Sequence, residues 1–497
     1  MTGLPSKLPP AAKAYLDAFP KGEIVAFALT SLDTIGIPVW VVALFPEDPV
    51  LEGIMPYGVG YGTSDEQAVL GALGEIAEMV FPTLSLSARV KTRASYRELV
   101  GVHGADAVTD PLTLCLPAGS PVDRNAVLEW VEARRWADNS SVLVPIDLAA
   151  YSANELSSGY RPFTTIISNG MGAGPDLAWA VGHGLLELLQ RDGNGLLFRA
   201  LDQGVLLDLP GDLPASTQAI LAKFDAADIA VMPKFATDEF GIANLYCTGA
   251  ERNGGEPSAA IMLTGCGEAA HPDRGQALDK ALCEFAASRV RKAFVHGSTT
   301  FAERVAPPNY IARFLARAGG AAPSSDPRAL DAMRAWNRAS SADLRQWLAD
   351  TVHAVRSHKP FDTLPIANVP DAQVRSRLVL DAVLGQGFDV LYVDMSPPGA
   401  PLATVKVIVP GLEVETMSYG RIGERNAYKL LQRDTGLVGF GGSSGDRLPI
   451  RLTPKAIARL GGVPWFDVAR AAQIVGPLYA MYREPEAHQL ASMEGRR

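Results

Sequence analysis

The 497-residue sequence lacks several patterns that identify common classes of protein. It has no GxxxxGK[ST] motif, which excludes a P-loop nucleotide site. No two cysteines form a CxxC pair, which excludes zinc ribbons and thioredoxin-like motifs. The four widely spaced cysteines instead predict reduced, mostly buried thiols at Cys115, Cys247, Cys266 and Cys283.

Positive charge and long apolar runs are also scarce. The formal net charge is -9 at pH 7, so no overall basic field attracts nucleic acid or anionic lipid. We expect neither a nucleic-acid partner nor a membrane association. The most apolar run, Ile37 to Phe45, is far shorter than a membrane span, and residues 1–19 lack the apolar core of a signal peptide. We therefore expect a cytoplasmic protein.

Strand-like and helical patterns alternate along the chain, which predicts an α+β fold with several packed units. A helix is expected from Thr63 or Ser64, where a cap precedes acidic first-turn residues, and a long helix over residues 276–294. A hairpin is expected over residues 23–45. Further strands are expected over residues 141–148, 163–168, 388–396 and 403–413. We place a division after residue 430, followed by a mostly helical C-terminal extension over residues 431–497.

Two parts of the chain resemble one another. Each has a strand pair around a D-x-x-G-I element, Asp33 to Ile37 and Asp238 to Ile242. Each pair is followed by a glycine-containing turn and a helix that bears glutamate. This order is consistent with an internal repeat.

Three helical patterns carry acidic residues among apolar neighbours. Glu75 and Glu78 share a face of the first, Glu187 lies on the second and Glu284 on the third. Buried carboxylates are costly unless they are paired or bind cations, so their recurrence suggests oxygen ligands for a divalent metal. Carboxylates with Mg²⁺ suit a nucleoside triphosphate. The alternative is ordinary ion pairs on helix surfaces, which contribute little to stability.

A glycine-rich segment, SNGMGAG at residues 168–174, precedes the second of these helices. Its glycines allow backbone N–H groups to approach an anion or another ligand closely at the positive end of a helix. A tight turn from strand to helix explains the same glycines at least as well.

The sequence resembles the YcaO family of ATP-dependent peptide-modifying enzymes from about residue 24 to about residue 425. The resemblance rests on motifs in the family's order: LTSLDTIGIPVW, GALGEIAE, SNGMGAG with HGLLELLQRD, ALDKALCEFAASR and VIVPGLE. It implies an α+β fold with mixed and antiparallel sheets packed against helices that carry the nucleotide site. It also implies ATP and Mg²⁺ as cofactors.

The resemblance further implies roles for individual residues. The implied metal ligands are Glu75, Glu78, Glu187 and Glu284. The implied nucleotide-binding residues are Ser168, Asn169, Glu187, Gln190, Arg191, Lys280 and Glu284. Arg289 matches an arginine with a more structural role. No residue is assigned as catalytic, because the sequence shows no obvious nucleophile.

Three positions depart from the family's usual pattern. Gln190 replaces the second glutamate of E-x-x-E-R-D, Lys280 replaces an arginine, and Tyr61 replaces the lysine of a Gly-Lys-Gly loop. An amide carries no charge for a metal, and lysine lacks the planar fork of arginine. These departures therefore bear on metal stoichiometry and on the binding of phosphate.

The resemblance implies ATP- and Mg²⁺-dependent activation of a backbone amide in a ribosomally synthesised precursor peptide. Attack by a Cys, Ser or Thr side chain would give an azoline or azole ring, sulfide would give a thioamide, and an amine would give an amidine. The alternative is a non-catalytic nucleotide-binding scaffold that supports a partner enzyme. The expected partners are the precursor peptide, a leader-binding or sulfur-delivery protein, and a second copy of the chain in a homodimer.

Overall fold

The computed structural model describes residues 3–194, 201–318, 326–414, 420–442 and 444–494. The chain divides into two compact units, each built from several stretches of sequence. The first unit contains residues 1–80, 197–368 and 477–497, and the second contains residues 81–196 and 369–476. The expected C-terminal extension therefore contributes to both units.

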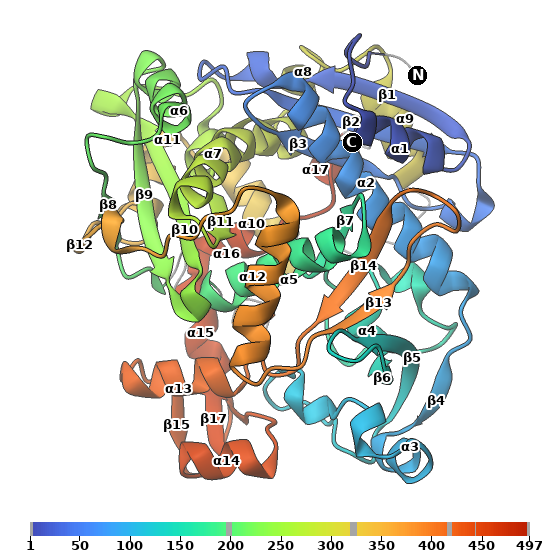
Figure 1. Ribbon diagram of the computed structural model, residues 1–497. Coiled ribbons are helices and arrows are strands. Elements are labelled where there is room, and N and C mark those ends of the chain that lie inside the picture. Colours follow the sequence, from blue (N-terminus) through green and yellow to red (C-terminus); the bar gives the residue numbers. More distant parts are fainter. Residues whose placement is uncertain (1–2, 195–200, 319–325, 415–419, 443, 495–497) are drawn as a thin grey trace. The chain divides into compact units, whose positions relative to one another are not determined.

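The first unit begins with an antiparallel sheet of order β1-β2-β3 and a long helix (Figure 1). Its elements are β1 (Gly22–Ala28), β2 (Val39–Pro46), β3 (Tyr57–Tyr61) and α2 (Asp65–Ala88), which belongs to this unit as far as Val80. The expected hairpin and the expected helix are both confirmed. The Ser64 hydroxyl accepts a hydrogen bond from the Gln67 amide at 3.3 Å and so caps α2.

A second sheet in this unit repeats the same order. Its strands are β9 (Ile229–Thr237), β10 (Ala243–Glu251) and β11 (Gly267–His271), and β8 (Val205–Asp208) and β12 (Ser357–Pro360) extend it beyond β9. Helix α7 (Arg274–His296) follows β11 as α2 follows β3, and α6 (Ala215–Ala226) packs beside it. Asp33 and Asp238 each lie in the connection between the first and second strands. The structure thus supports the internal repeat.

Apolar cores hold the first unit together. In one core, Phe27 packs edge-on against Tyr310 with ring centroids 4.9 Å apart, and Trp336 is buried. In another, the Phe224 and Phe285 rings stack 5.7 Å apart. Burial of each large apolar side chain contributes about 1.5–3 kcal/mol. The first core also gathers side chains from later helices of the unit, which include α9 (Tyr310–Ala318), α10 (Pro327–Arg338), α11 (Ser341–Ala349), α16 (Tyr479–Tyr482) and α17 (Gln489–Glu494).

The second unit contains a sheet of order β4-β5-β13-β14-β7, with β6 paired to β5. Helix α5 packs on β7 and β14, and α12 packs on α5. The strands are β4 (Thr92–Ser95), β5 (Val127–Arg135), β6 (Ser141–Pro145), β7 (Met171–Gly174), β13 (Leu391–Asp394) and β14 (Ala403–Ile408). The helices include α3 (Tyr96–His103), α5 (Leu177–Asn194), α12 (Ala372–Gly385) and α13 (Glu424–Gln432).

Two strand predictions in this unit need correction. The strand expected over residues 141–148 ends at Pro145, and helix α4 (Ile146–Ala149) follows. The strand expected over residues 163–168 is wrong, because this segment pairs with no neighbouring strand among the described residues. Side chains bind its backbone instead: Asp147 accepts from the Phe163 amide, and Lys406 donates to the Ile167 carbonyl.

The second unit also contains a small antiparallel sheet of order β15-β17-β16. Its strands are β15 (Val438–Phe440), β16 (Arg447–Pro449) and β17 (Pro464–Asp467), with helices α14 (Pro454–Leu460) and α15 (Val468–Val475) between or after them. Residues 431–497 therefore combine short helices with a sheet.

Glycines allow three helices to lie directly on strands. A Cβ on Gly60 of β3 would lie 1.9 Å from the carbonyl oxygen of Ala68 in α2. A Cβ on Gly172 of β7 or Gly267 of β11 would lie 2.1 Å from a carbonyl oxygen of α5 or α7. Any side chain there would push helix and strand apart. Close packing is thus a structural reason for glycine in residues 168–174.

Helix α2 is long and apolar enough to cross a membrane by length and composition alone. Of the most apolar 18-residue stretch of this helix, 56% is buried inside the structure. Core helices of globular proteins pass the same test.

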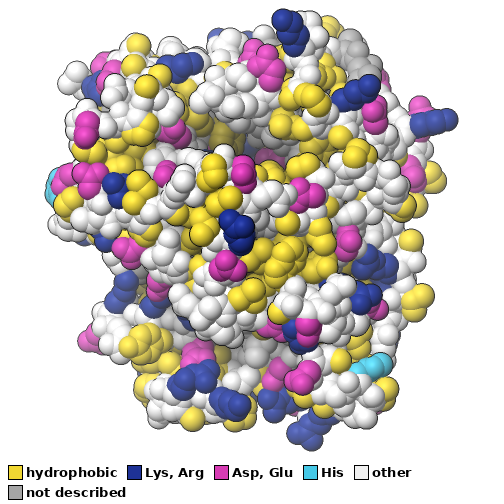
Figure 2. Space-filling view, in the orientation of Figure 1, with side chains coloured by type: hydrophobic (Ala, Val, Ile, Leu, Met, Phe, Trp, Pro, Cys, Tyr) yellow, Lys and Arg dark blue, Asp and Glu magenta, His cyan; other side chains and the backbone are white. Residues whose placement is uncertain are grey.

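The described residues form the expected fold class, α+β with mixed and antiparallel sheets packed against helices. Acidic and basic side chains lie interspersed over most of the face in Figure 2. All four cysteines are free, and three of them are buried, as expected.

Candidate functional site

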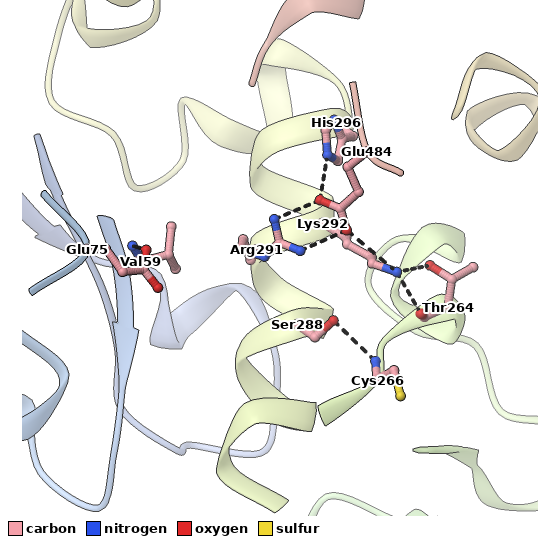
Figure 3. Close-up of polar contacts among 9 residues, drawn as sticks. All are labelled: Val59, Glu75, Thr264, Cys266, Ser288, Arg291, Lys292, His296 and Glu484. Carbon is pink, nitrogen blue, oxygen red and sulfur yellow. Dashed lines mark hydrogen bonds and ion pairs between the residues drawn. The ribbon is translucent and has the colours of Figure 1, made fainter. Parts of the chain in front are cut away.

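Glu75 lies on α2 beside the edge of the first sheet. Its Oε2 accepts a hydrogen bond from the Val59 amide of β3 at 2.9 Å (Figure 3). Because β3 is an edge strand, the carboxylate takes the place of a neighbouring strand as acceptor. This hydrogen bond fixes one oxygen of the side chain.

Glu284 lies on α7 and contacts the same strand from the second repeat. The Tyr61 hydroxyl at the end of β3 donates to Glu284 Oε2 at 2.5 Å. Burial, and then the charges of Glu284 and Glu75, raise the pKa of Tyr61 well above its usual value, so the hydroxyl stays protonated and donates. One of the four expected metal ligands, Glu284, therefore accepts a hydrogen bond from this hydroxyl group.

Glu78 and Lys280 flank this pair along their helices. Glu78 is half-buried, and its charge adds to the effect of burial in raising the pKa of Tyr15. Lys280 is exposed and lies one turn before Glu284 on α7. The structure thus places four expected residues of the first unit on α2 and α7.

In the second unit, Glu187 repeats the arrangement of Glu75. Its Oε2 accepts from the Gly170 amide at 2.9 Å, just before β7. Its Oε1 lies 3.4 Å from Nη2 of Arg191, one turn later on α5. The carboxylate is thus held from one side by the turn, and a cation lies beside it.

The other expected residues of this unit differ in exposure. Gln190 is almost fully buried, with 6% of its surface exposed. Ser168 is exposed, and the Asn169 amide group donates to the Val414 carbonyl at 2.7 Å. The structure therefore gives Asn169 a role in holding the turn, whereas Ser168 faces solvent.

The donor set can be tested against Mg²⁺ directly. Among the described residues, no group of three or more His, Cys, Asp or Glu side chains could hold a metal ion. Mg²⁺ does not need such a group, because it usually keeps several waters and takes one or two carboxylates together with substrate phosphates. Glu75, Glu284 and Glu187 carry carboxylates, the kind of ligand that Mg²⁺ takes together with nucleotide phosphates.

Arg289 has the structural role that was expected. It is completely buried, and it donates to Asp33 Oδ2 at 2.6 Å and to Glu251 Oε1 at 2.5 Å. Asp33 belongs to the first D-x-x-G-I element, and Glu251 ends β10 of the second repeat. The ion pairs thus join the two repeats within the first unit.

A second charged cluster lies further along α7 (Figure 3). Glu484 binds Arg291 through two contacts of 2.7 Å, and His296 Nε2 lies 3.0 Å from its Oε2. Lys292 lies 3.9 Å away and also donates to the Thr264 carbonyl. Burial opposes ionisation of Glu484, but these cations outweigh it and hold its pKa well below the usual value. The cluster fastens the last segment of the first unit to α7.

We expect Glu484→Gln to lower the free energy of unfolding by about 2 kcal/mol at pH 7, because it removes charge-assisted hydrogen bonds. Because the pKa of Glu484 in the folded chain lies below its usual value of 4.5, the ionised side chain stabilises the fold fully at pH values above 4.5. This stabilisation is lost as the pH falls through the folded pKa. Burial lowers the pKa of His296 below 6.5, so acidification acts in the same direction.

Thermal unfolding from pH 7 to pH 4 tests this expectation. The variant should lose less stability on acidification than the parent chain. Glu486→Gln, at an exposed position of the same segment, is the control. An equal effect of both substitutions would contradict the role of the cluster.

Three of these features escaped sequence reasoning. Tyr61 was noted only as a departure, because its partner lies 223 positions away. Glu484 carries no local signal at all. Asp192, 2% exposed, ends the LLELLQRD motif, where it accepts from the Glu413 amide at 2.9 Å and binds Arg425 at 2.7 Å. The one sign of Asp192 in the sequence was an acidic residue near the end of an apolar helix.

Comparison with known proteins places these residues in a wider context. A family model described as YcaO cyclodehydratase, ATP- and Mg²⁺-binding, matches residues 59–413. The matched span includes every residue that was expected to bind metal or nucleotide. A related protein from Methanothermobacter thermautotrophicus, described as an uncharacterized protein, is 28% identical over 405 residues. The match covers 80% of this chain and 91% of that protein.

Two solved structures have the same fold. A heterocyclase in complex with substrate and cofactor matches with a TM-score of 0.55 and 18% identity, over 78% of this chain and 49% of that one. This chain therefore spans about half the length of that heterocyclase. The YcaO protein from Methanopyrus kandleri, bound with AMPPCP and Mg²⁺, matches with a TM-score of 0.54 and 17% identity, over 83% of this chain and 91% of that one.

Proposed function

Because the chain belongs to the YcaO family of ATP- and Mg²⁺-binding cyclodehydratases, we propose that it activates a backbone amide of a ribosomally made precursor peptide. The observation that carries the proposal is that Glu75 and Glu284 each have one carboxylate oxygen held by a donor of β3, the Val59 amide and the Tyr61 hydroxyl. Glu187 beside Arg191 supplies the corresponding groups of the second unit. Both sets lie within the matched span.

In the proposed ring formation, a Cys, Ser or Thr side chain of the peptide adds to the carbon of the preceding amide and loses its S–H or O–H proton to solvent. The former carbonyl oxygen takes the γ-phosphoryl group of ATP, and ADP leaves with the electrons of the broken P–O bond. Inorganic phosphate then leaves the carbon while the nitrogen loses its proton, which forms the C=N bond of an azoline.

The chain's own residues bind and orient the reactants in this scheme. Mg²⁺, when bound, neutralises charge on the phosphates. Glu75 and Glu284 in the first unit, and Glu187 in the second, are the carboxylates that would bind Mg²⁺, and each has one oxygen that accepts from an N–H or O–H donor. Lys280 in the first unit and Arg191 in the second are the cations that would bind phosphate oxygens. No protein nucleophile is required.

The rival proposal is a non-catalytic nucleotide-binding scaffold. It draws support from Gln190, which offers an amide oxygen where a carboxylate is usual, and from Lys280, which cannot make a bidentate contact. We favour a working enzyme, because the carboxylates on α2, α5 and α7 are present and held.

We expect Gln190→Glu to retain ATP hydrolysis and to lower the Mg²⁺ concentration needed for half-maximal activity several-fold. The added carboxylate supplies charge to a metal that otherwise depends on Glu187 and the phosphates. Phosphate release in the presence of precursor peptide and partner protein measures this. If neither the parent chain nor the variant hydrolyses ATP, the scaffold proposal holds.

Mass spectrometry of the peptide tests which product forms. The reaction contains the chain, ATP, Mg²⁺, a candidate precursor peptide with Cys, Ser and Thr residues, and a candidate leader-binding or sulfur-delivery protein. Loss of one water per site would indicate cyclodehydration, and replacement of one oxygen by sulfur would indicate thioamide formation. An unchanged mass while ATP is hydrolysed would contradict the proposal. We expect little product when the partner protein is omitted.

A further inference from the structure

Tyr61 occupies an unusual position between the two repeats of the first unit. It is the last residue of β3, where its backbone pairs with Val39 of β2. Its ring packs against both apolar cores of the unit. Its hydroxyl reaches α7 and donates to Glu284 Oε2 at 2.5 Å. The strand and both cores therefore fix the position of the phenol ring, whose hydroxyl contacts the carboxylate.

Glu284 needs such a contact, because a glutamate side chain in mid-helix turns about three single bonds. The glutamates on α2 and α5 are each fixed by a backbone amide: Glu75 by Val59 and Glu187 by Gly170, both at 2.9 Å. Glu284 Oε2 accepts instead from a side chain, the Tyr61 hydroxyl, at 2.5 Å. Tyr61 thus provides for Glu284 the kind of hydrogen bond that a backbone amide provides for the other two carboxylates.

We propose that Tyr61 is a positioning residue, which holds the Glu284 carboxylate in the orientation that binds Mg²⁺ with the nucleotide. The inference rests on the proposed function and adds a residue to that same site. Removal of a donor that orients a metal-binding carboxylate typically lowers the metal affinity by about 10- to 100-fold. The hydroxyl acts on binding rather than on the chemical step.

Tyr61→Phe removes the hydroxyl and keeps the ring. The experiment follows thermal unfolding of the full chain at a fixed concentration of AMPPCP while Mg²⁺ is varied, so that no turnover is needed. We expect the Mg²⁺ concentration for half-maximal stabilisation to rise roughly tenfold. Tyr57→Phe is the matched control, because Tyr57 lies on the same strand with its ring edge-on to Phe314.

A double-mutant cycle with Glu284→Asp tests the same contact independently. Glu284→Asp withdraws the carboxylate from the hydroxyl, so it should raise the same Mg²⁺ midpoint. Adding Tyr61→Phe to Glu284→Asp should then change the midpoint no further, since the contact is already lost. Additive shifts would show that the two residues act independently and would overturn the inference.

The outcomes separate the inference from the function on which it rests. If the parent chain is stabilised by AMPPCP with Mg²⁺ and Tyr61→Phe keeps its midpoint, only the inference is wrong. If Tyr61→Phe lowers the unfolding temperature without nucleotide and leaves the midpoint unchanged, Tyr61 is merely structural and the inference is again wrong. If the parent chain shows no stabilisation, the proposed function fails and the inference fails with it.

Discussion

Glu284→Ala should abolish the stabilisation of the chain by ATP with Mg²⁺ and lower ATP turnover by about 100-fold or more. Loss of this carboxylate leaves phosphate charge uncompensated in a partly buried site, where electrostatic interactions are strong. At a nucleotide concentration of about 100 times Kd, binding stabilises a protein by about 2.7 kcal/mol. The variant should lose all of this increment.

Thermal unfolding with and without nucleotide measures the effect, and phosphate release measures turnover. Gln276→Ala is the control, because Gln276 is exposed on the same helix, α7. It should behave as the parent chain. Normal nucleotide stabilisation in Glu284→Ala would mean that this carboxylate has been assigned to the wrong role.

Arg289→Met should lower the free energy of unfolding by about 3–5 kcal/mol. The substitution leaves two carboxylates, Asp33 and Glu251, without their cation, and their side chains are only 6% and 12% exposed. Removing one partner of a buried ion pair is costly because the remaining charge stays desolvated. The ion pairs also join the two repeats, so the loss should affect the first unit as a whole.

Urea unfolding of the purified chain measures this loss. Arg252→Met is the matched control, since Arg252 pairs with Asp225 at 2.7 Å but both side chains are exposed, at 39% and 68%. An exposed pair contributes about 0–1 kcal/mol. Equal losses for the two arginine variants would contradict the distinction between the buried and the exposed pair.

Local patterns predicted most elements of the fold. The hairpin at residues 23–45 and the helices α2 and α7 followed from strand-like runs, caps and helical spacing of apolar residues. The strand prediction for residues 163–168 was wrong, because the apolar residues of this segment favour an extended backbone but no strand among the described residues pairs with it. Pairing is a tertiary property that local spacing does not encode.

The candidate site was predictable in part. The glutamates were visible as acids in apolar helical patterns, and the resemblance supplied their roles. Their fixing contacts were not visible: the Val59 amide, the Gly170 amide and the Tyr61 hydroxyl come from strands and turns, and Tyr61 lies 223 positions from its partner. The glycines of residues 168–174 left two explanations open, and the close approach of Gly172 to α5 gives one of them a structural basis.

Calorimetric titration with AMPPCP tests most directly whether the helix glutamates of the first unit hold the nucleotide with Mg²⁺. The parent chain should bind AMPPCP only when Mg²⁺ is present. Glu75→Ala and Glu284→Ala should each abolish that binding, whereas Glu66→Ala, in the first turn of α2, should not. Nucleotide binding that survives either glutamate substitution unchanged, or that needs no Mg²⁺, would contradict the account.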